Sequence, residues 1–600
     1  MREAAPPTDS TALALPTAEP LTETATFATW DGTELFYRLW RPARPTEKVL
    51  VLFHRGHEHS GRFADVVEAL GLEDVTVYAW DARGHGRSPG ERGYAPSFGG
   101  MVRDVEMFIR HLSDQYGHDS RDMIVLAHSV AAVTVAAWVH DYAPRLRGLI
   151  LATPALRVRL YVPLAIPGLR LLQKLRGPRK KTFIKSYVKS KMLTHDPAQA
   201  AAYDDNPLIA KAIAVSVLLG LHDAGSRLIE DAAQITTPTL MLAGGSDYVV
   251  SVKAQRRFFD NLGAPQKKLR VFDAMYHDVL HEKDRKLVLD EVRRFIAERF
   301  AKPVAEVDLR SADTVGPMHD EYRRLSTPLP ATSPRNLAFR GQDALLKTVG
   351  RLSEGIRLGY DTGFDSGQSL DYVYENKSKG RLGVGRLLDR VYLDALGWRG
   401  IRQRRTHLQE LLGRAIRRAA ERDGAAHVLD VATGCGRYVL DTIRRAEVES
   451  VSATLRDFHG DNLEQAKQHA ASFGIKRVDF EIGDAFDEMS LASVMPTPNV
   501  AVVSGLYELF PENAPLQKSL RGLAAGLSEG GYLLYTGQPW HPQVEMIARV
   551  LPSHRGKSWV MRRRSQAELD QLVRDAGFEK IDMLIDEWGI FTVSLARKVS

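Results

Sequence analysis

Residues 430–436 read Asp-Val-Ala-Thr-Gly-Cys-Gly and follow the short apolar run 427–430. A strand that passes through glycines into a helix lets the backbone approach a ligand closely, and the helix N-terminus favours a carboxylate. Dinucleotide sites use a related turn, but the acidic residue at its start and the lack of a third spaced glycine favour another ligand. The stretch therefore predicts an α/β domain with a small-molecule site above this turn.

Further strand-like runs follow this turn, at residues 448–455, 478–482, 500–503 and 532–535. Asp457 ends the first of them, where a carboxylate can accept both hydroxyls of a ribose. Asp484 and Ala485 follow the next run, where a carboxylate can accept an adenine amine hydrogen. The order of these features indicates one parallel sheet with its ligand at the carboxyl edge.

This set resembles a class I S-adenosylmethionine-dependent methyltransferase over roughly residues 370 to 600, with Ala432 in place of the family's first glycine. The resemblance implies a Rossmann-like fold and S-adenosyl-L-methionine as the cofactor. It also implies cofactor contacts from Asp430, Ala432, Gly434, Gly436, Asp457, Asp484 and Ala485.

The methyl acceptor is less legible in the sequence. Residues 504–510 lack the Asn/Asp-Pro-Pro-Tyr signature of enzymes that methylate planar amides and nucleobases. We expect Tyr374, Tyr507 and His541 to line the acceptor site. His541 lies in a proline-bracketed loop, where it acts as a general base or belongs only to a rigid turn, and both interpretations stay open.

A different α/β domain precedes this one. Its apolar runs lie at residues 48–53, 74–79, 123–127, 149–152, 239–242 and 268–272. Continuous apolar runs separated by helical patterns are typical of a mostly parallel sheet covered on both faces. We expect a disordered tail at 1–23, the first domain at 24–300, a linker at 301–368 and the second domain at 369–600.

Ser129 lies in the sequence Ala-His-Ser-Val-Ala at 127–131, between an apolar run and a helical run. A nucleophilic serine is placed this way, on a sharp strand-to-helix turn, although alanines stand here for the usual glycines. Alone, the motif could equally be a buried serine that starts a helix. Asp247 and His277 each follow a later strand, and the order Ser, Asp, His predicts a catalytic triad.

Residues 54–63 (His-Arg-Gly-His-Glu-His-Ser-Gly-Arg-Phe) and 81–88 (Asp-Ala-Arg-Gly-His-Gly-Arg-Ser) resemble the monoacylglycerol lipase/lysophospholipase branch of α/β hydrolases, of the serine aminopeptidase S33 type. The resemblance implies cleavage of a carboxylic ester of a monoacyl lipid. It also implies an oxyanion hole from the backbone amides of Gly56 and Val130. Arg55 replaces a family glycine, and its side chain either crowds that hole or binds an anionic headgroup.

An insertion at about 155–230 is expected to form a helical cap. Residues 142–195 contain no acidic residue, and their lysines and arginines alternate with apolar side chains. A basic amphipathic cap would be drawn to anionic membranes, whereas the alternative is an ordinary solvated basic face. The sequence shows no nucleic-acid-binding module and no metal-ligand spacing.

The composition fits a cytoplasmic protein. The single cysteine, Cys435, cannot form an internal disulfide, and the N-terminal residues have no apolar signal-peptide core. Formal charge is only +7 for 600 residues, so the clustering of charge matters more than its sum.

The whole chain resembles bacterial fusions of an α/β hydrolase with a class I methyltransferase, which implies a bifunctional enzyme of phospholipid metabolism. The rival interpretation is a degenerate hydrolase domain that only binds lipid.

Overall fold

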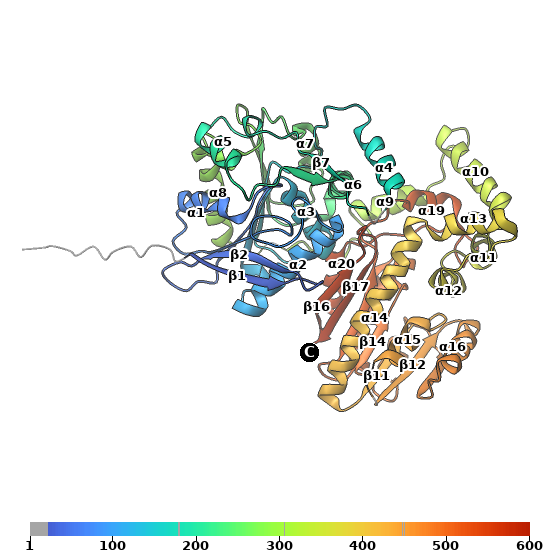
Figure 1. The fold of residues 1–600 in the computed structure, drawn as a ribbon. Coiled ribbons are helices and arrows are strands. Elements are labelled where there is room, and N and C mark those ends of the chain that lie inside the picture. The colour runs from blue at the N-terminus through green and yellow to red at the C-terminus, as the bar shows by residue number, and fades with distance from the viewer. Residues whose placement is uncertain (1–21, 178–179, 305, 447, 449, 600) are drawn as a thin grey trace, which may run out of the picture.

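The computed structural model describes residues 22–599, apart from 178, 179, 305, 447 and 449. Two α/β lobes follow each other along the chain, coloured blue to green and yellow to red in Figure 1. Most of the predicted tail lies outside the described residues, but residues 22 and 23 already belong to strand β1 (Thr22–Ala28). No helix in the described residues has both the length and the apolar character of a membrane span.

The first lobe contains an eight-stranded sheet in the order β1-β2-β4-β3-β5-β6-β9-β10. β1 and β2 (Glu34–Trp40) are antiparallel, and the remaining strands run parallel to one another. These are β3 (Val49–Phe53), β4 (Thr76–Trp80), β5 (Met123–His128), β6 (Gly148–Ala152), β9 (Thr239–Gly244) and β10 (Lys267–Phe272). The predicted mostly parallel sheet is confirmed.

Helices cover both faces of this sheet, as its fully buried strands require. In β3, Val49 and Val51 pack with α2 (Phe98–Tyr116), α3 (Val130–Tyr142) and α6 (Val215–Asp231). Leu50 and Leu52 point the other way, toward α1 (Ala64–Leu70) and α8 (Lys286–Phe300). Alternate residues of one strand thus build two separate cores.

The predicted cap is present between β6 and β9. It contains α4 (Ala165–Arg176), α5 (Pro197–Asp204), the N-terminal part of α6 and a two-stranded ribbon of β7 (Phe183–Lys185) and β8 (Ala212–Ala214). α4 has no buried residue, and Leu164, Leu171 and Leu175 on or beside it are exposed.

The second lobe contains a seven-stranded sheet in the order β13-β12-β11-β14-β15-β17-β16. Five strands are parallel: β11 (Ala426–Asp430), β12 (Val451–Asp457), β13 (Val478–Ile482), β14 (Val500–Val503) and β15 (Tyr532–Gly537). β17 (Thr592–Lys598) is antiparallel to β15 and to β16 (Phe578–Ile585). The strand order reverses between β11 and β14, which is where open α/β sheets bind ligands, and the predicted Rossmann-like architecture is confirmed.

The segment predicted as a linker, residues 301–368, carries helices instead of an open connection. They are α9 (Pro317–Ser326), α10 (Pro334–Lys347) and α11 (Glu354–Thr362), followed by α12 (Gly367–Glu375), α13 (Leu382–Leu393) and α14 (Leu396–Asp423). The Ser-Pro pair at 333–334 starts α10 and is not part of an irregular loop. The Ser333 hydroxyl caps the helix, and proline suits its first turn.

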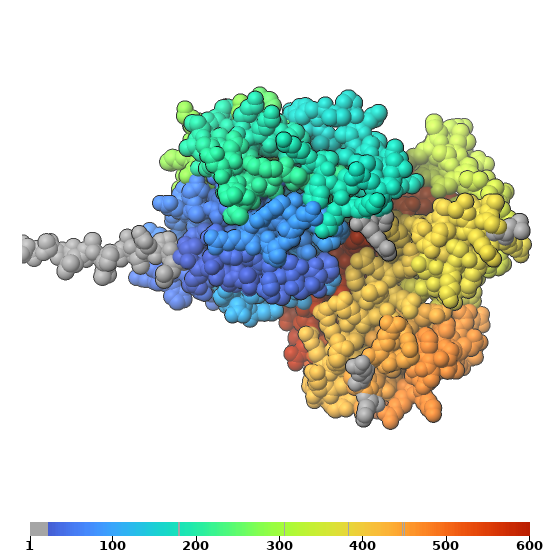
Figure 2. Space-filling view, in the orientation of Figure 1, coloured from blue at the N-terminus to red at the C-terminus, as the bar shows by residue number. Residues whose placement is uncertain are grey.

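The two lobes touch along the C-terminal strands, which appear in red between them in Figure 2. Met583 of β16 belongs to the same buried cluster as the core of the first lobe. The Lys580 ammonium donates to the Tyr142 carbonyl at 2.8 Å, and Arg110 pairs with Asp582 at 2.7 Å. The contact is therefore partly a shared hydrophobic core and not only a polar surface.

Candidate active sites

Ser129 occupies the sharp turn between β5 and α3. Its φ of 58° and ψ of −111° are strained for a residue with a side chain, as in a nucleophile elbow. The turn is held on both sides, because the Ser129 amide donates to the Ala152 carbonyl and the Ala155 amide donates to the Ser129 carbonyl. The flanking alanines are compatible with this geometry.

Ser129, His277 and Asp247 form a continuous hydrogen-bonded relay. His277 Nε2 lies 2.8 Å from Ser129 Oγ, and His277 Nδ1 lies 2.8 Å from Asp247 Oδ2. Burial opposes ionisation of Asp247, but the His277 ring and the amides of Val249 and Val250 outweigh it and lower the pKa of the carboxyl. An ionised Asp247 holds the proton on Nδ1, which leaves Nε2 free to accept the serine proton.

Gly56 and Val130, the predicted oxyanion residues, lie against each other. A Cβ atom at position 56 would come within 2.8 Å of Val130 Cγ2, and both residues border a cavity of about 30 Å³. In the described part of the chain, the Gly56 amide has no hydrogen-bond acceptor of its own. Glycine is needed here because only a residue without a side chain lets the two amides converge beside the nucleophile.

Arg55 fits neither interpretation offered by the sequence. Its guanidinium is buried, donates to Glu58 Oε1 at 2.8 Å, lies 3.4 Å from Asp278 Oδ2 and stacks over the Tyr203 ring. The side chain is therefore part of an internal ionic cluster and is not available to a headgroup or to the oxyanion hole.

The relay is covered by the cap. Ser129 is only 4% exposed and His277 only 1%. Cap residues are fastened to the loops that carry the relay, through hydrogen bonds from the Asp278 amide to the Leu193 carbonyl and from the Ala210 amide to the His57 carbonyl. An ester must therefore reach Ser129 beneath the cap.

A second site is a cleft of about 710 Å³ above the carboxyl edge of the second sheet. Five of the predicted cofactor residues line it, namely Ala432, Gly434, Asp457, Asp484 and Ala485. The connection between α11 and α12 covers the cleft, with Asp365 and Gly367 among its lining residues.

Asp457 organises the glycine turn as well as bordering the cleft. Asp457 Oδ2 accepts from the Gly434 amide at 2.8 Å, and Oδ1 accepts from the His459 amide and from Asn462 Nδ2, both at 2.9 Å. Gly434 has a φ of +55°, a conformation that glycine adopts without strain.

Asp430 and Gly436, also predicted to contact the cofactor, do not line the cleft. Asp430 is fully buried beneath the turn, where it accepts from the Tyr438 hydroxyl at 2.6 Å and where burial raises its pKa to about 7. Gly436 precedes α15 (Arg437–Arg445) with a φ of +65°. Asp430 ends β11 beneath the turn, and Gly436 lies where the turn enters α15. Both residues therefore shape the turn itself.

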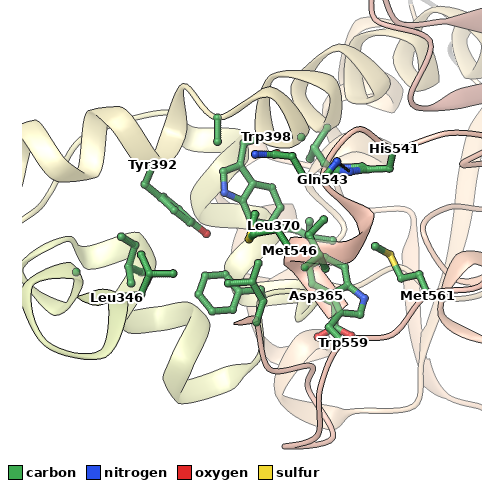
Figure 3. Close-up of a pocket in the computed structure, with 18 of the residues that line it drawn as sticks. Leu346, Asp365, Leu370, Tyr392, Trp398, His541, Gln543, Met546, Trp559 and Met561 are labelled. Carbon is green, nitrogen blue, oxygen red and sulfur yellow. Dashed lines mark hydrogen bonds between the residues drawn. The ribbon is translucent and has the colours of Figure 1, made fainter. Parts of the chain in front are cut away.

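An apolar cavity of about 420 Å³ adjoins this cleft and shares Asp365, Leu370, Gly505 and Leu509 with it. Figure 3 shows Leu346 and Tyr392 at one side of the cavity, Trp398 near its middle, and His541, Trp559 and Met561 toward the other side. Helices of the segment predicted as a linker supply much of its wall, including Leu346 of α10.

Of the three residues predicted to line the acceptor site, only His541 lines this cavity. Its Nδ1 accepts from the Gln543 amide at 3.0 Å, and burial lowers its pKa to about 3. The ring is thus neutral with its proton on Nε2, which makes it a donor and argues against the general-base interpretation.

Tyr507 and Tyr374 lie outside the cavity wall. Tyr507 is buried in the core beneath, with its hydroxyl bonded to Ser519, and the ring of Tyr374 packs under Arg405. Glu508, Gln538 and Arg404 supply polar groups to the cavity wall, although none of the three was among the residues predicted to line the acceptor site. Glu508 and Gln538 follow β14 and β15, and that position alone could have indicated them.

Comparison with known proteins matches both halves. A family model described as "Putative methyltransferase" covers residues 292–598, and one described as "Serine aminopeptidase, S33" covers residues 44–284. The "Uncharacterized protein YnbC" of Escherichia coli (strain K12) is 50% identical over 573 residues, which is 95% of this chain and 97% of that protein.

Two further relatives match the first lobe alone. The monoacylglycerol lipase of Mycolicibacterium smegmatis is 29% identical over 271 residues, 45% of this chain and 95% of that protein. The crystal structure of a Paleococcus ferrophilus monoacylglycerol lipase, at 22% identity, covers 46% of this chain and 99% of that chain with a TM-score of 0.39. The chain thus belongs to the methyltransferase family whose model spans its C-terminal half, and it carries in front an α/β-hydrolase domain related to the monoglyceride lipases.

Proposed function

We propose that the chain is a bifunctional enzyme, a serine esterase that cleaves a monoacyl lipid ester and an S-adenosylmethionine-dependent methyltransferase that acts on a small or lipid-derived acceptor. The single observation that carries the esterase half is the Ser129–His277–Asp247 relay, with both links at 2.8 Å. The monoacyl ester, as either a monoacylglycerol or a lysophospholipid, is inferred from the related lipases.

The relay supports acyl transfer through a covalent intermediate. Ser129 Oγ attacks the ester carbonyl while His277 Nε2 takes its proton, and the amides of Gly56 and Val130 stabilise the oxyanion. His277 then returns the proton to the leaving alcohol, and a water molecule activated by the same ring hydrolyses the acyl-serine.

The cleft beside Asp457 has the size and the donor set to hold S-adenosylmethionine. Its volume lies in the range of small-molecule sites, and carboxylates border it at the ends of β12 and β13. When bound, the cofactor would supply an electrophilic methyl group. Asp457 would bind the ribose hydroxyls, Asp484 the adenine amine, and Gly434 would leave room for the methionine part.

The basic cap supports peripheral contact with an anionic membrane as part of this proposal. Tyr161, Val162 and Leu164 are more than half exposed and are followed by basic residues of α4, including Lys174 and Arg176. Such a surface binds lipid by apolar insertion together with charge. Sedimentation with phosphatidylglycerol vesicles, but not with phosphatidylcholine vesicles, is the expected result, and equal binding to both would remove the anionic preference.

A fluorophosphonate probe tests the esterase half. We expect the wild-type chain to be labelled and Ser129→Ala not to be. Absence of labelling in the wild type would favour the second candidate function, a hydrolase lobe that only binds lipid. The near-complete burial of Ser129 is the observation that favours this second candidate. A chain-length panel of esters then separates lipid esters from small ones. Calorimetric titration with S-adenosylmethionine tests the transferase half.

A further inference from the structure

The cavity beside the cofactor cleft has almost entirely apolar walls. The largest lining side chains are aromatic. Trp398 and Trp559, labelled in Figure 3, come from different parts of the chain, and Phe591 comes from a third. Its volume of about 420 Å³ is that of a small-molecule site. Binding in it is driven mainly by the transfer of apolar ligand surface out of water.

Five buried polar atoms on residues that line this cavity have no hydrogen-bond partner among the described residues. They are Glu508 Oε2, Gln538 Nε2, Arg404 Nε, Tyr392 Oη and Trp559 Nε1. Buried polar groups are nearly always paired in native proteins, so a cluster of unpaired ones around one cavity indicates a ligand with polar atoms of its own. Glu508 Oε2 is an acceptor, whereas the nitrogen atoms can only donate.

Glu508 lines the apolar cavity and is linked through Thr536 to Gly505, a residue that borders both the cavity and the cofactor cleft. The Gly505 amide donates to Thr536 Oγ1 at 2.8 Å, and Thr536 Oγ1 donates to Glu508 Oε1 at 2.8 Å. Gly505 borders both spaces, so this chain of bonds fixes Glu508 beside the junction and leaves Oε2 unpaired.

We propose that the acceptor is a lipid-like amphiphile with a neutral hydroxyl head, whose apolar chain fills the cavity and whose hydroxyl lies between Glu508 and Gln538. The inference rests on the proposed methyltransferase function and adds the chemical class of the acceptor. A hydroxyl group donates to Glu508 Oε2 and accepts from Gln538 Nε2, which satisfies both atoms. A fatty acid carboxylate has no proton for Glu508 and would meet a like charge there.

Glu508 acts as the catalytic base in this arrangement. The hydroxyl oxygen forms the bond to the methyl carbon, the bond from that carbon to the sulfonium sulfur breaks with its electron pair left on sulfur, and the hydroxyl proton passes to Glu508 Oε2. The products are a methyl ether and S-adenosylhomocysteine. Arg404, whose Nη1 lies 3.9 Å from Glu508 Oε1, balances the charge of the carboxylate before the proton arrives.

The far end of the cavity opens between α10 and α13. Leu345, Val349 and Val391 line the cavity and are also 57%, 46% and 64% exposed. Side chains that are both lining and exposed mark a mouth, and an apolar mouth lets a chain longer than the cavity extend out of it. This feature favours an amphiphile with a long chain over a small compact acceptor.

Binding of a fluorescent alcohol tests the pocket without the transfer reaction. The probe is 12-(nitrobenzoxadiazolylamino)dodecan-1-ol, titrated into the full chain, with its dodecanoic acid counterpart as comparison. We expect the alcohol to bind more tightly than the acid. Val391→Arg should weaken binding by about tenfold or more, because a charge then stands in the mouth.

Val384→Arg is the matched control. Val384 lies on the same helix, is 61% exposed and does not line the cavity, so the same substitution there should leave binding unchanged. Equal effects of the two substitutions, tighter binding of the acid, or no saturable binding of either probe would overturn the proposal.

Transfer of tritium from S-adenosyl-[methyl-³H]methionine to dodecanol tests the role of Glu508. Glu508→Gln keeps the shape of the side chain, and we expect it to lower the rate about 10²- to 10⁴-fold with S-adenosylmethionine affinity unchanged. Methylation of butanol as fast as dodecanol, or full activity of Glu508→Gln, would contradict the inference. Failure of S-adenosylmethionine to bind the wild type would instead refute the proposed function. Calorimetry on the same preparation measures that binding and so distinguishes the two outcomes.

Discussion

Arg563 of the methyltransferase lobe donates two hydrogen bonds, of 3.0 and 3.1 Å, to Asp231, the last residue of α6 in the hydrolase lobe. Both side chains are buried. Arg563 also donates to the Pro539 carbonyl, in the loop that carries His541, so one guanidinium connects α6 to the wall of the apolar cavity. The two lobes are therefore expected to unfold together.

Arg563→Met should lower the free energy of unfolding by about 3–5 kcal/mol, because it leaves the Asp231 carboxylate buried with less compensation. Differential scanning calorimetry of the full chain should show the single transition of the wild type divide into two. Glu354→Ala, which breaks a partly exposed pair with Arg357, is the control and should cost less than about 1 kcal/mol. An Arg563→Met protein that melts like the wild type would argue against this connection.

Gly56→Ala should reduce kcat for ester hydrolysis about 10²- to 10³-fold, because the added Cβ would lie 2.8 Å from Val130 Cγ2 and push an oxyanion amide away. The double variant Gly56→Ala/Val130→Ala removes that clash and should regain most of the rate. Steady-state kinetics with a p-nitrophenyl ester measure both. Failure of the second substitution to restore activity would mean that the amide geometry is not what Gly56 provides.

The stability of the hydrolase lobe should depend on pH through His281. Burial disfavours its charged form, but the charge of Asp278 and hydrogen bonds to Asp278 and Asp65 raise the pKa of His281 from its ordinary value of 6.5 to about 10. A raised histidine pKa stabilises the folded state fully below pH 6.5, and this contribution is lost as the pH rises toward 10.

His281→Asn should therefore be less stable than the wild type at pH 6, and the difference should shrink by pH 10. Urea unfolding at pH 6, 8 and 10 measures it. Asp278→Asn removes the partner carboxylate and should flatten the same pH dependence. A difference between wild type and His281→Asn that stays constant over this range would contradict the assignment.

Asp457→Ala should weaken S-adenosylmethionine binding by about 10- to 100-fold, the value of a charged hydrogen bond, and should also loosen the turn that its Oδ2 holds at Gly434. Isothermal titration calorimetry gives the affinity. Asp479→Ala is the control, because Asp479 is exposed on β13 and does not line the cleft. Equal affinities in Asp457→Ala and the wild type would place the cofactor elsewhere.

Sequence patterns were enough to predict two mostly parallel sheets and to place candidate sites at their carboxyl edges. Long apolar runs such as 48–53 and 123–127 are typical of strands buried on both faces, and residues that follow parallel strands meet at one edge of the sheet. For that reason the sequence could place Ser129, Asp247 and His277 together, and five of the seven residues predicted to contact a cofactor line one cleft.

The side chains that surround those edges could not be predicted, because they depend on packing between distant segments. Arg55 could be assigned to its internal partner only when Asp278, more than 200 residues away, was placed beside it. The apolar cavity beside the second cleft is lined by segments that lie far apart in the chain, including α10 within the segment predicted as a linker, and Arg404, Glu508 and Gln538 supply polar groups to its wall. Periodicity reports which face of an element is buried, but packing between distant segments sets which side chains share a cavity, and no local pattern encodes that choice.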